Sequence, residues 1–218
     1  RSPINGRASI GRMSRGTASS VMPRVLAAAL SCSRRNAGSV VRYVLNRAGL
    51  IGGEHAFAST ELVFSYGRNI VPPGADPENI LFLPPIDTRC FHNLDNPDDH
   101  RRSGVLLYPG RHQAGLACYP ELAARATLIT ASWPETHEEL AALFRRSEAV
   151  YCFESTAIAL EATLCGCPAI ILPSPYFNGV LLSAEELGND GFALDDSPAE
   201  VERARQTVGR MAQTYQAT

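Results

Sequence analysis

The chain has 218 residues, of which 45% are hydrophobic and 19% are charged, and its formal net charge is −2. This length and composition allow one or two domains with a hydrophobic core and exclude an intrinsically disordered chain. All 20 basic residues are arginine, so a phosphate-binding loop of the G-x-x-x-x-G-K-[ST] type, a Schiff-base lysine and a lysine general base are excluded.

The basic residues are concentrated at the start of the chain. Residues 1–53 hold nine arginines and no acidic residue, whereas the rest holds eleven arginines and 22 Asp or Glu. Such a start is typical of a transit peptide or of a nucleic-acid-binding arm, and it also fits a truncated or misread gene start. The apolar stretch at 25–30 is too short for a signal-peptide core or a membrane span. We interpret residues 1–36 as a basic, poorly structured or non-native start.

Residues 37–103 contain three predicted elements and a polar connection. Apolar residues recur at helical spacing over 39–46 and predict a short helix that ends before Gly49. Residues 61–65 predict a strand, and 79–85 predict an extended run that two prolines close. Residues 87–103 are rich in Asp, Asn, His, Pro and Arg, a composition typical of an interdomain linker.

From Gly104 onward, apolar strands alternate with amphipathic helices. Strands are predicted at 105–108, 127–130, 149–153, 169–172 and 192–194, and helices at 119–125, 135–146, 156–164, 184–187 and from 198 to about 213. This alternation predicts an α/β fold with a Rossmann-like parallel sheet that carries helices on both faces. Ligands of such sheets bind beyond the carboxyl ends of the strands.

Residues 151–173 are the most informative segment. They comprise a buried strand end, the helix start Ser155-Thr156, a short helix that carries Glu161, a stop at Gly166 and a second apolar strand. Free backbone N–H groups beside a pair of hydroxyl groups form a place where a phosphate can bind. The segment therefore predicts a nucleotide site.

Three motifs resemble the donor domain of GT-B glycosyltransferases with a family-4-like C-terminal half. They are Gly-Val-Leu-Leu-Tyr-Pro-Gly-Arg at 104–111, Pro-x-x-x-Glu-Glu-Leu at 134–140 and Glu-Ala-Thr-Leu-Cys-Gly-Cys-Pro at 161–168. Residues 83–91 are similar to the interdomain segment of that family, and 40–46 resemble a helix of the acceptor domain in bacterial surface-polysaccharide members. The resemblance implies a partial acceptor domain at 37–86, a linker at 87–103 and a nucleotide-sugar-binding domain at 104–218.

The resemblance assigns roles to single residues. Glu161 matches the glutamate that accepts both ribose hydroxyl groups, and Arg111 matches the arginine that neutralises the donor diphosphate. Trp133 follows the second strand, at a position that implies stacking on the nucleobase. The alternative interpretations are a surface glutamate, a solvated loop arginine and a tryptophan that packs at a helix start.

The same resemblance brings Glu154, Ser155 and Thr156 into the donor site. Ser155 and Thr156 would donate to the diphosphate, although helix capping alone explains both residues equally well. Glu154 would contact the sugar hydroxyl groups, but it lies one residue closer to Glu161 than the family spacing requires. The family usually has a lysine shortly after the position of Arg111, where this chain has His112. A single fixed cation is therefore expected here, unless His112 substitutes.

No metal site is expected. The cluster of Asp95, Asp98, Asp99 and His100 has suitable ligand atoms but no regular spacing, and a polar linker accounts for it. The six cysteines show no Cys-x-x-Cys spacing and are interpreted as reduced thiols.

The predicted function is transfer of a sugar from a nucleoside diphosphate sugar to a hydroxyl group of a glycan or lipid-linked acceptor. No catalytic residue is assigned, and no cofactor is expected apart from the donor substrate. The alternative is a nucleotide-binding module without catalysis or an inactive fragment of such an enzyme, because two full Rossmann-like domains need roughly 300 residues. A sugar-nucleotide epimerase is the weaker third candidate. We expect a cytoplasmic protein that binds no nucleic acid. Peripheral contact with a membrane is expected if the acceptor is lipid-linked.

Overall fold

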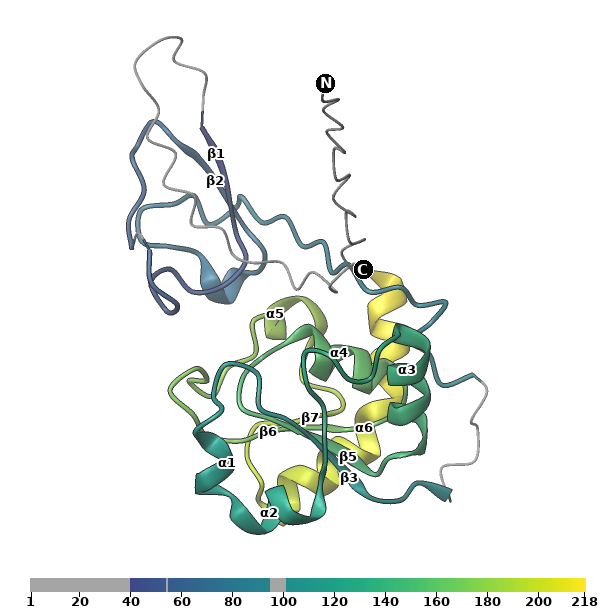
Figure 1. The fold of residues 1–218 in the computed structure, drawn as a ribbon. Coiled ribbons are helices and arrows are strands. Elements are labelled where there is room, and N and C mark those ends of the chain that lie inside the picture. The colour runs from purple at the N-terminus through teal and green to yellow at the C-terminus, as the bar shows by residue number, and fades with distance from the viewer. Residues whose placement is uncertain (1–39, 54, 95–100) are drawn as a thin grey trace, which may run out of the picture.

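The computed structural model describes residues 40–53, 55–94 and 101–218. These residues form a five-stranded, all-parallel sheet in the order β4-β3-β5-β6-β7 and a separate two-stranded parallel sheet (Figure 1). The strands of the larger sheet are β3 (Val105–Tyr108), β4 (Thr127–Leu128), β5 (Ala149–Cys152), β6 (Ala169–Ile171) and β7 (Phe192–Ala193). The Rossmann-like α/β class predicted from the alternating pattern is confirmed.

Helices cover both faces of the larger sheet. They are α1 (Gly115–Cys118), α2 (Pro120–Arg125), α3 (His137–Arg146), α4 (Ala157–Leu164), α5 (Ala184–Leu187) and α6 (Pro198–Ala217). Leu106 of β3 packs in a cluster with α3, α4 and the second half of α6, whereas Leu107 packs with α2 and the first half of α6. Burial on both faces explains why the central strands appear in the sequence as continuous apolar runs.

Local signals in the sequence account for the bounds of α3. Thr136 caps the helix by accepting a hydrogen bond from the backbone N–H of Glu139, whose side chain in turn accepts from Thr136. Glu138 and Glu139 lie in the first turn and Arg145 and Arg146 in the last, as the helix dipole favours. The helix begins two residues later than predicted because the capping residue is Thr136.

The smaller unit consists of β1 (Val41–Val44), β2 (Leu62–Ser65) and the 3-10 helix η1 (Arg68–Ile70). The helix predicted for residues 39–46 is wrong, because residues 41–44 form β1, which pairs in parallel with β2. Valine and tyrosine favour extended backbone, and pairing with β2 buries Val44 against Val63. The strand predicted at 61–65 is confirmed as β2.

The connection between the two units runs along β2 and then onto the larger unit. The backbone N–H of Leu81 donates to the carbonyl of Ser65 (2.9 Å), so residues near Ile80 extend the smaller sheet. Phe91, inside the predicted linker, is only 2% exposed, and its ring lies 6.5 Å from that of Phe144. Packing of the larger unit thus begins well before Gly104.

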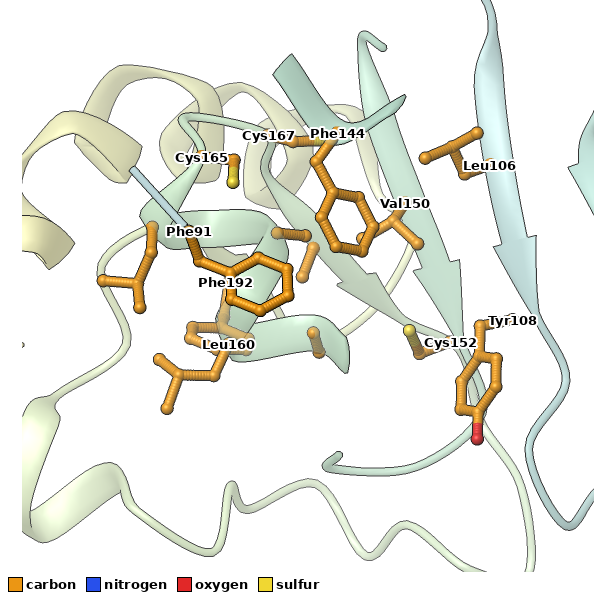
Figure 2. Close-up of a cluster of buried hydrophobic side chains, with 14 of the residues drawn as sticks. Phe91, Leu106, Tyr108, Phe144, Val150, Cys152, Leu160, Cys165, Cys167 and Phe192 are labelled. Carbon is orange, nitrogen blue, oxygen red and sulfur yellow. The ribbon is translucent and has the colours of Figure 1, made fainter. Parts of the chain in front are cut away.

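The main core lies between the sheet and α3, α4 and α6. Figure 2 shows Phe91, Phe144, Leu160 and Phe192 converging on this space, with Cys165 and Cys167 at its upper edge. All five cysteines of the described residues are free thiols, as predicted. Burial raises the pKa of Cys165 and of Cys167 to about 12, so both remain protonated hydrophobic side chains at neutral pH. Among the residues that the structure describes, no helix is both long and apolar enough to cross a bilayer.

Candidate functional site

The loops that follow four parallel strands meet at one edge of the larger sheet. Arg111 follows β3, Trp133 follows β4, Glu154 and Ser155 follow β5, and Tyr176 follows β6. Because carboxyl ends of parallel strands share an edge, residues far apart in the sequence gather there. Arg111, Trp133, Glu154 and Ser155 therefore lie in loops at the edge of the sheet where ligands of this fold bind.

Glu154 fixes the loop between β3 and α1. Its side chain is only 5% exposed, one carboxylate oxygen accepts from the backbone N–H of Arg111 (3.0 Å), and the other forms an ion pair with the Arg111 guanidinium. Gly110 lies between these groups with φ 54°, and a Cβ at this position would overlap the Glu154 carboxylate. Glu154 and Arg111, which the resemblance assigns to different parts of a donor substrate, thus form a pair with no net charge.

Ser155 and Thr156 both have hydrogen-bond partners within the protein. Thr156 is the capping residue of α4, and its hydroxyl oxygen accepts from the backbone N–H of Ala159 (3.3 Å). The hydroxyl oxygen of Ser155 accepts from the backbone N–H of Leu182 (3.3 Å). The capping interpretation is thereby confirmed for Thr156, and each hydroxyl group retains its own hydrogen for donation to a ligand.

Glu161 lies in the second turn of α4 and is half-buried. Its carboxylate has neither a hydrogen-bond partner nor an ion-pair partner among the described residues, and desolvation raises its pKa to about 7. Burial is the main reason why the pKa values of Cys90 and Tyr215 are raised, and the charge of Glu161 adds to both shifts; Glu161 therefore lies towards the segment that joins the two units and the end of α6. A carboxylate that is desolvated without a partner is a frequent mark of a binding or catalytic position.

A cleft separates the smaller unit from the carboxyl edge of the larger sheet. The space that it encloses is small, about 10 Å³, because the cleft is largely open to solvent, and it is lined by Asn46, Arg47, Leu50, Glu154, Ser155, Tyr176, Phe177, Val180 and Leu182. Of the predicted site residues, only Glu154 and Ser155 line this cleft. The smaller unit and the loop after β6 supply the rest.

The other predicted residues lie outside the lining of the cleft. Trp133 is 41% exposed in the turn before α3. Thr156 lies one residue beyond Ser155 at the start of α4, and Glu161 is further along the same helix. Arg111 contacts the cleft indirectly, through Glu154.

Arg47 is the cationic side chain of the cleft that sequence reasoning missed. It follows the carboxyl end of β1, and its guanidinium donates a hydrogen bond to the side-chain oxygen of Asn178 in the loop after β6. Partial burial lowers the pKa of Arg47. Loops that follow parallel strands commonly form binding sites. Had a strand been predicted at 41–44 instead of a helix, the loop that contains Arg47 would have been a candidate site.

His112 lies close to two other aromatic rings, those of Phe153 and Tyr176. The His112 ring lies 5.4 Å from that of Phe153 in a T-shaped arrangement and 6.0 Å from that of Tyr176. Tyr176 and Phe177 come from the Pro-Ser-Pro-Tyr-Phe-Asn-Gly run directly after a predicted strand, a signal that could have identified this loop. Of these three rings, Tyr176 lines the cleft and Phe153 is fully buried, and His112 approaches the cleft only through Tyr176.

The described residues contain no group of three or more His, Cys, Asp or Glu that could hold a metal ion. The cluster of Asp95, Asp98, Asp99 and His100 considered in the sequence lies outside the described residues.

Two comparisons with known proteins identify no relative. No protein-family model matches the chain, and none of the curated proteins matches it. The geometry of the site and the resemblance in sequence are therefore the grounds for a functional proposal.

Proposed function

We propose that the chain binds a nucleoside diphosphate sugar and acts as a glycosyltransferase of the GT-B type, transferring the sugar to a hydroxyl acceptor. The observation that carries the proposal is the cleft at the carboxyl edge of the parallel sheet, with Ser155 at the start of α4 on one wall and the smaller unit on the other. A sheet of this kind binds nucleotides at this edge, and the start of a helix favours phosphate.

The parts of the donor are assigned along α4. The diphosphate lies at the helix start near Ser155 and Thr156, and the ribose lies near Glu161, about 7.5 Å further along the helix axis at 1.5 Å per residue. An ionised Glu161 would accept hydrogen bonds from two ribose hydroxyl groups, and this would give the carboxylate the partners that the described residues do not supply. Trp133 is assigned to the nucleobase, since its exposed indole is available for stacking.

The reaction proposed is displacement of the nucleoside diphosphate by an acceptor hydroxyl group. The acceptor is a glycan or a lipid-linked sugar, the reaction takes place in the cytoplasm, and contact with a membrane surface is needed only for a lipid-linked acceptor. No nucleic acid takes part. The Arg111–Glu154 pair holds the loop that borders the leaving group.

A second candidate is a nucleotide-binding module without catalysis. The observation in its favour is that Glu154 is the only carboxylate that lines the cleft within the described ranges, and it is already paired with Arg111. A general base for the acceptor hydroxyl group is therefore not evident, and binding without turnover is the function that remains.

Calorimetric titration with UDP, GDP and ADP tests the claim that both candidates share. We expect one of the three to bind the wild type, and Glu161→Ala to weaken that binding roughly tenfold or more because two charge-assisted hydrogen bonds are lost. Glu185→Ala, at an exposed position of α5, is the control and should bind like the wild type. Absence of binding by all three, or equal affinity of the Glu161 variant, would contradict the proposed site.

Release of free nucleoside diphosphate from a panel of sugar donors separates the two candidates. Turnover with one donor supports the glycosyltransferase. Retained nucleotide affinity without turnover, with glycan acceptors present, supports the binding module.

A further inference from the structure

The smaller unit places a guanidinium group in the wall of the cleft. Arg47 lies just beyond the end of β1 and faces a lining that includes Ser155 at the start of α4. Its backbone N–H donates to the side-chain oxygen of Asn46 (2.8 Å), and its guanidinium donates to the side-chain oxygen of Asn178. These bonds hold Arg47 between the smaller unit and the loop that follows β6.

The two arginines nearest the edge of the sheet differ in their partners. Arg111 is neutralised by the buried carboxylate of Glu154. Arg47 forms no ion pair among the described residues, and the partner of its guanidinium is the neutral amide of Asn178. Glu154 also lines the cleft, but both of its oxygens are engaged by Arg111.

A guanidinium that lines a cleft without a counter-ion among the described residues is available to form charge-assisted hydrogen bonds with a bound anion. Partial burial already lowers the pKa of Arg47, and the chain has no lysine to share the task. The helix start at Ser155 and Thr156 adds a partial positive charge to the same space. An anion bound in the cleft would face both the Arg47 guanidinium and this helix start.

We propose that Arg47 binds the diphosphate of the donor, so that the smaller unit contributes directly to the donor site. This inference rests on the proposed function for the identity of the ligand, but the anion site stands on the geometry of Arg47 itself. Arg47 supplies the second fixed cation that the sequence after Arg111 lacks. A diphosphate bound between Arg47 and the start of α4 bridges the two units.

Binding of inorganic pyrophosphate and of the preferred nucleoside diphosphate tests this inference. The variants are Arg47→Gln, which removes the charge, and Arg47→Lys, which keeps it, with Arg125→Gln at an exposed position of α2 as a matched control. We expect Arg47→Gln to weaken both ligands roughly tenfold to a hundredfold. Arg47→Lys should recover part of this loss and Arg125→Gln should bind like the wild type. Thermal unfolding of each variant verifies that it is folded.

The outcomes separate this inference from the proposed function. Pyrophosphate binding that depends on Arg47, without any nucleotide binding, supports the anion site and contradicts the nucleotide assignment. Nucleotide binding that depends on Glu161 but is unchanged in Arg47→Gln overturns the role of Arg47 and leaves the proposed function intact. A wild type that does not bind pyrophosphate, or that loses no affinity in Arg47→Gln, overturns the inference.

Discussion

Glu154 and Glu161 are seven residues apart in the sequence, yet their surroundings are opposite in kind. Glu154 is almost fully buried and has both a backbone N–H and a guanidinium as partners. Glu161 is desolvated without a partner among the described residues. Satisfied buried charge is typical of a residue that maintains structure, whereas an unsatisfied carboxylate is typical of a residue that awaits a ligand. The resemblance groups both residues as ligand contacts, but their surroundings favour a structural role for Glu154 and a ligand-binding role for Glu161.

The raised pKa of Glu161 predicts a pH dependence of stability. Since burial raises this pKa from 4.5 to about 7, the folded protein keeps a proton that the unfolded chain has lost. The contribution of Glu161 is thus most favourable below pH 4.5 and is lost as the pH rises through 7. Glu161→Gln should therefore gain stability relative to wild type between about pH 5 and pH 8, by as much as about 3 kcal/mol.

Urea unfolding of both proteins at the two pH values measures this difference. Any cost of the amide itself is the same at both pH values, so the change with pH isolates the carboxylate. A difference in unfolding free energy that is constant from pH 5 to pH 8 would show that Glu161 is well solvated.

The loop between β3 and α1 is the element on which the edge of the cleft depends. Gly110 has φ 54°, and a side chain at this position would collide with the Glu154 carboxylate. The conformation of the loop therefore depends on the close approach of the Gly110 backbone to the Glu154 carboxylate, which places Arg111 next to Glu154. Only glycine satisfies both the backbone conformation and the available space.

Gly110→Ala should destabilise the protein more than Gly74→Ala does. Both glycines have positive φ, 54° and 83°, but a Cβ at Gly74 meets no atom within 4 Å. Both variants place a side chain at a positive φ, and the overlap with Glu154 adds roughly 1–3 kcal/mol to the cost at Gly110 alone. Denaturant unfolding of the two variants gives the comparison, and equal losses would mean that the loop relaxes without cost.

The two units of the molecule differ in how well their sheets are covered. The larger sheet is buried on both faces. In the smaller unit, Val41 is 61% exposed and Leu62 is 43% exposed on one face of the β1–β2 pair. Within the described residues, the hydrogen bonds that join the units include that from the Arg68 backbone N–H to the Glu186 carboxylate (2.8 Å) and that from the Asn69 side chain to the Leu181 carbonyl (3.1 Å). The smaller unit therefore has much less buried apolar surface to stabilise it.

Hydrogen exchange should reveal this difference across the whole molecule. Backbone N–H groups of β5 and β6 are expected to exchange only through global unfolding, because these strands are central and covered on both sides. Those of β1 and β2 should exchange roughly a hundredfold faster or more, through local opening of the smaller unit. Exchange measured by mass spectrometry or NMR checks this, and equal protection in both sheets would indicate one cooperative unit.

The sequence by itself determined the parallel α/β domain from residue 104 onward and most of its elements. Strand and helix patterns there are local and repeated, as in the capped, amphipathic α3 and the apolar β5. The strand at 41–44 could not be predicted, because a short apolar run fits either period and only pairing with β2 decides between them.

Tertiary structure alone decided which side chains meet. The Arg111–Glu154 pair joins residues 43 positions apart, and the Arg47–Asn178 hydrogen bond spans 131 positions. No local sequence pattern predicts either contact. Both follow from the order of strands in the sheet and from the packing of one unit on the other. The physical reason is that secondary structure is set by neighbours in the chain, whereas charge pairing and the cleft are set by neighbours in space.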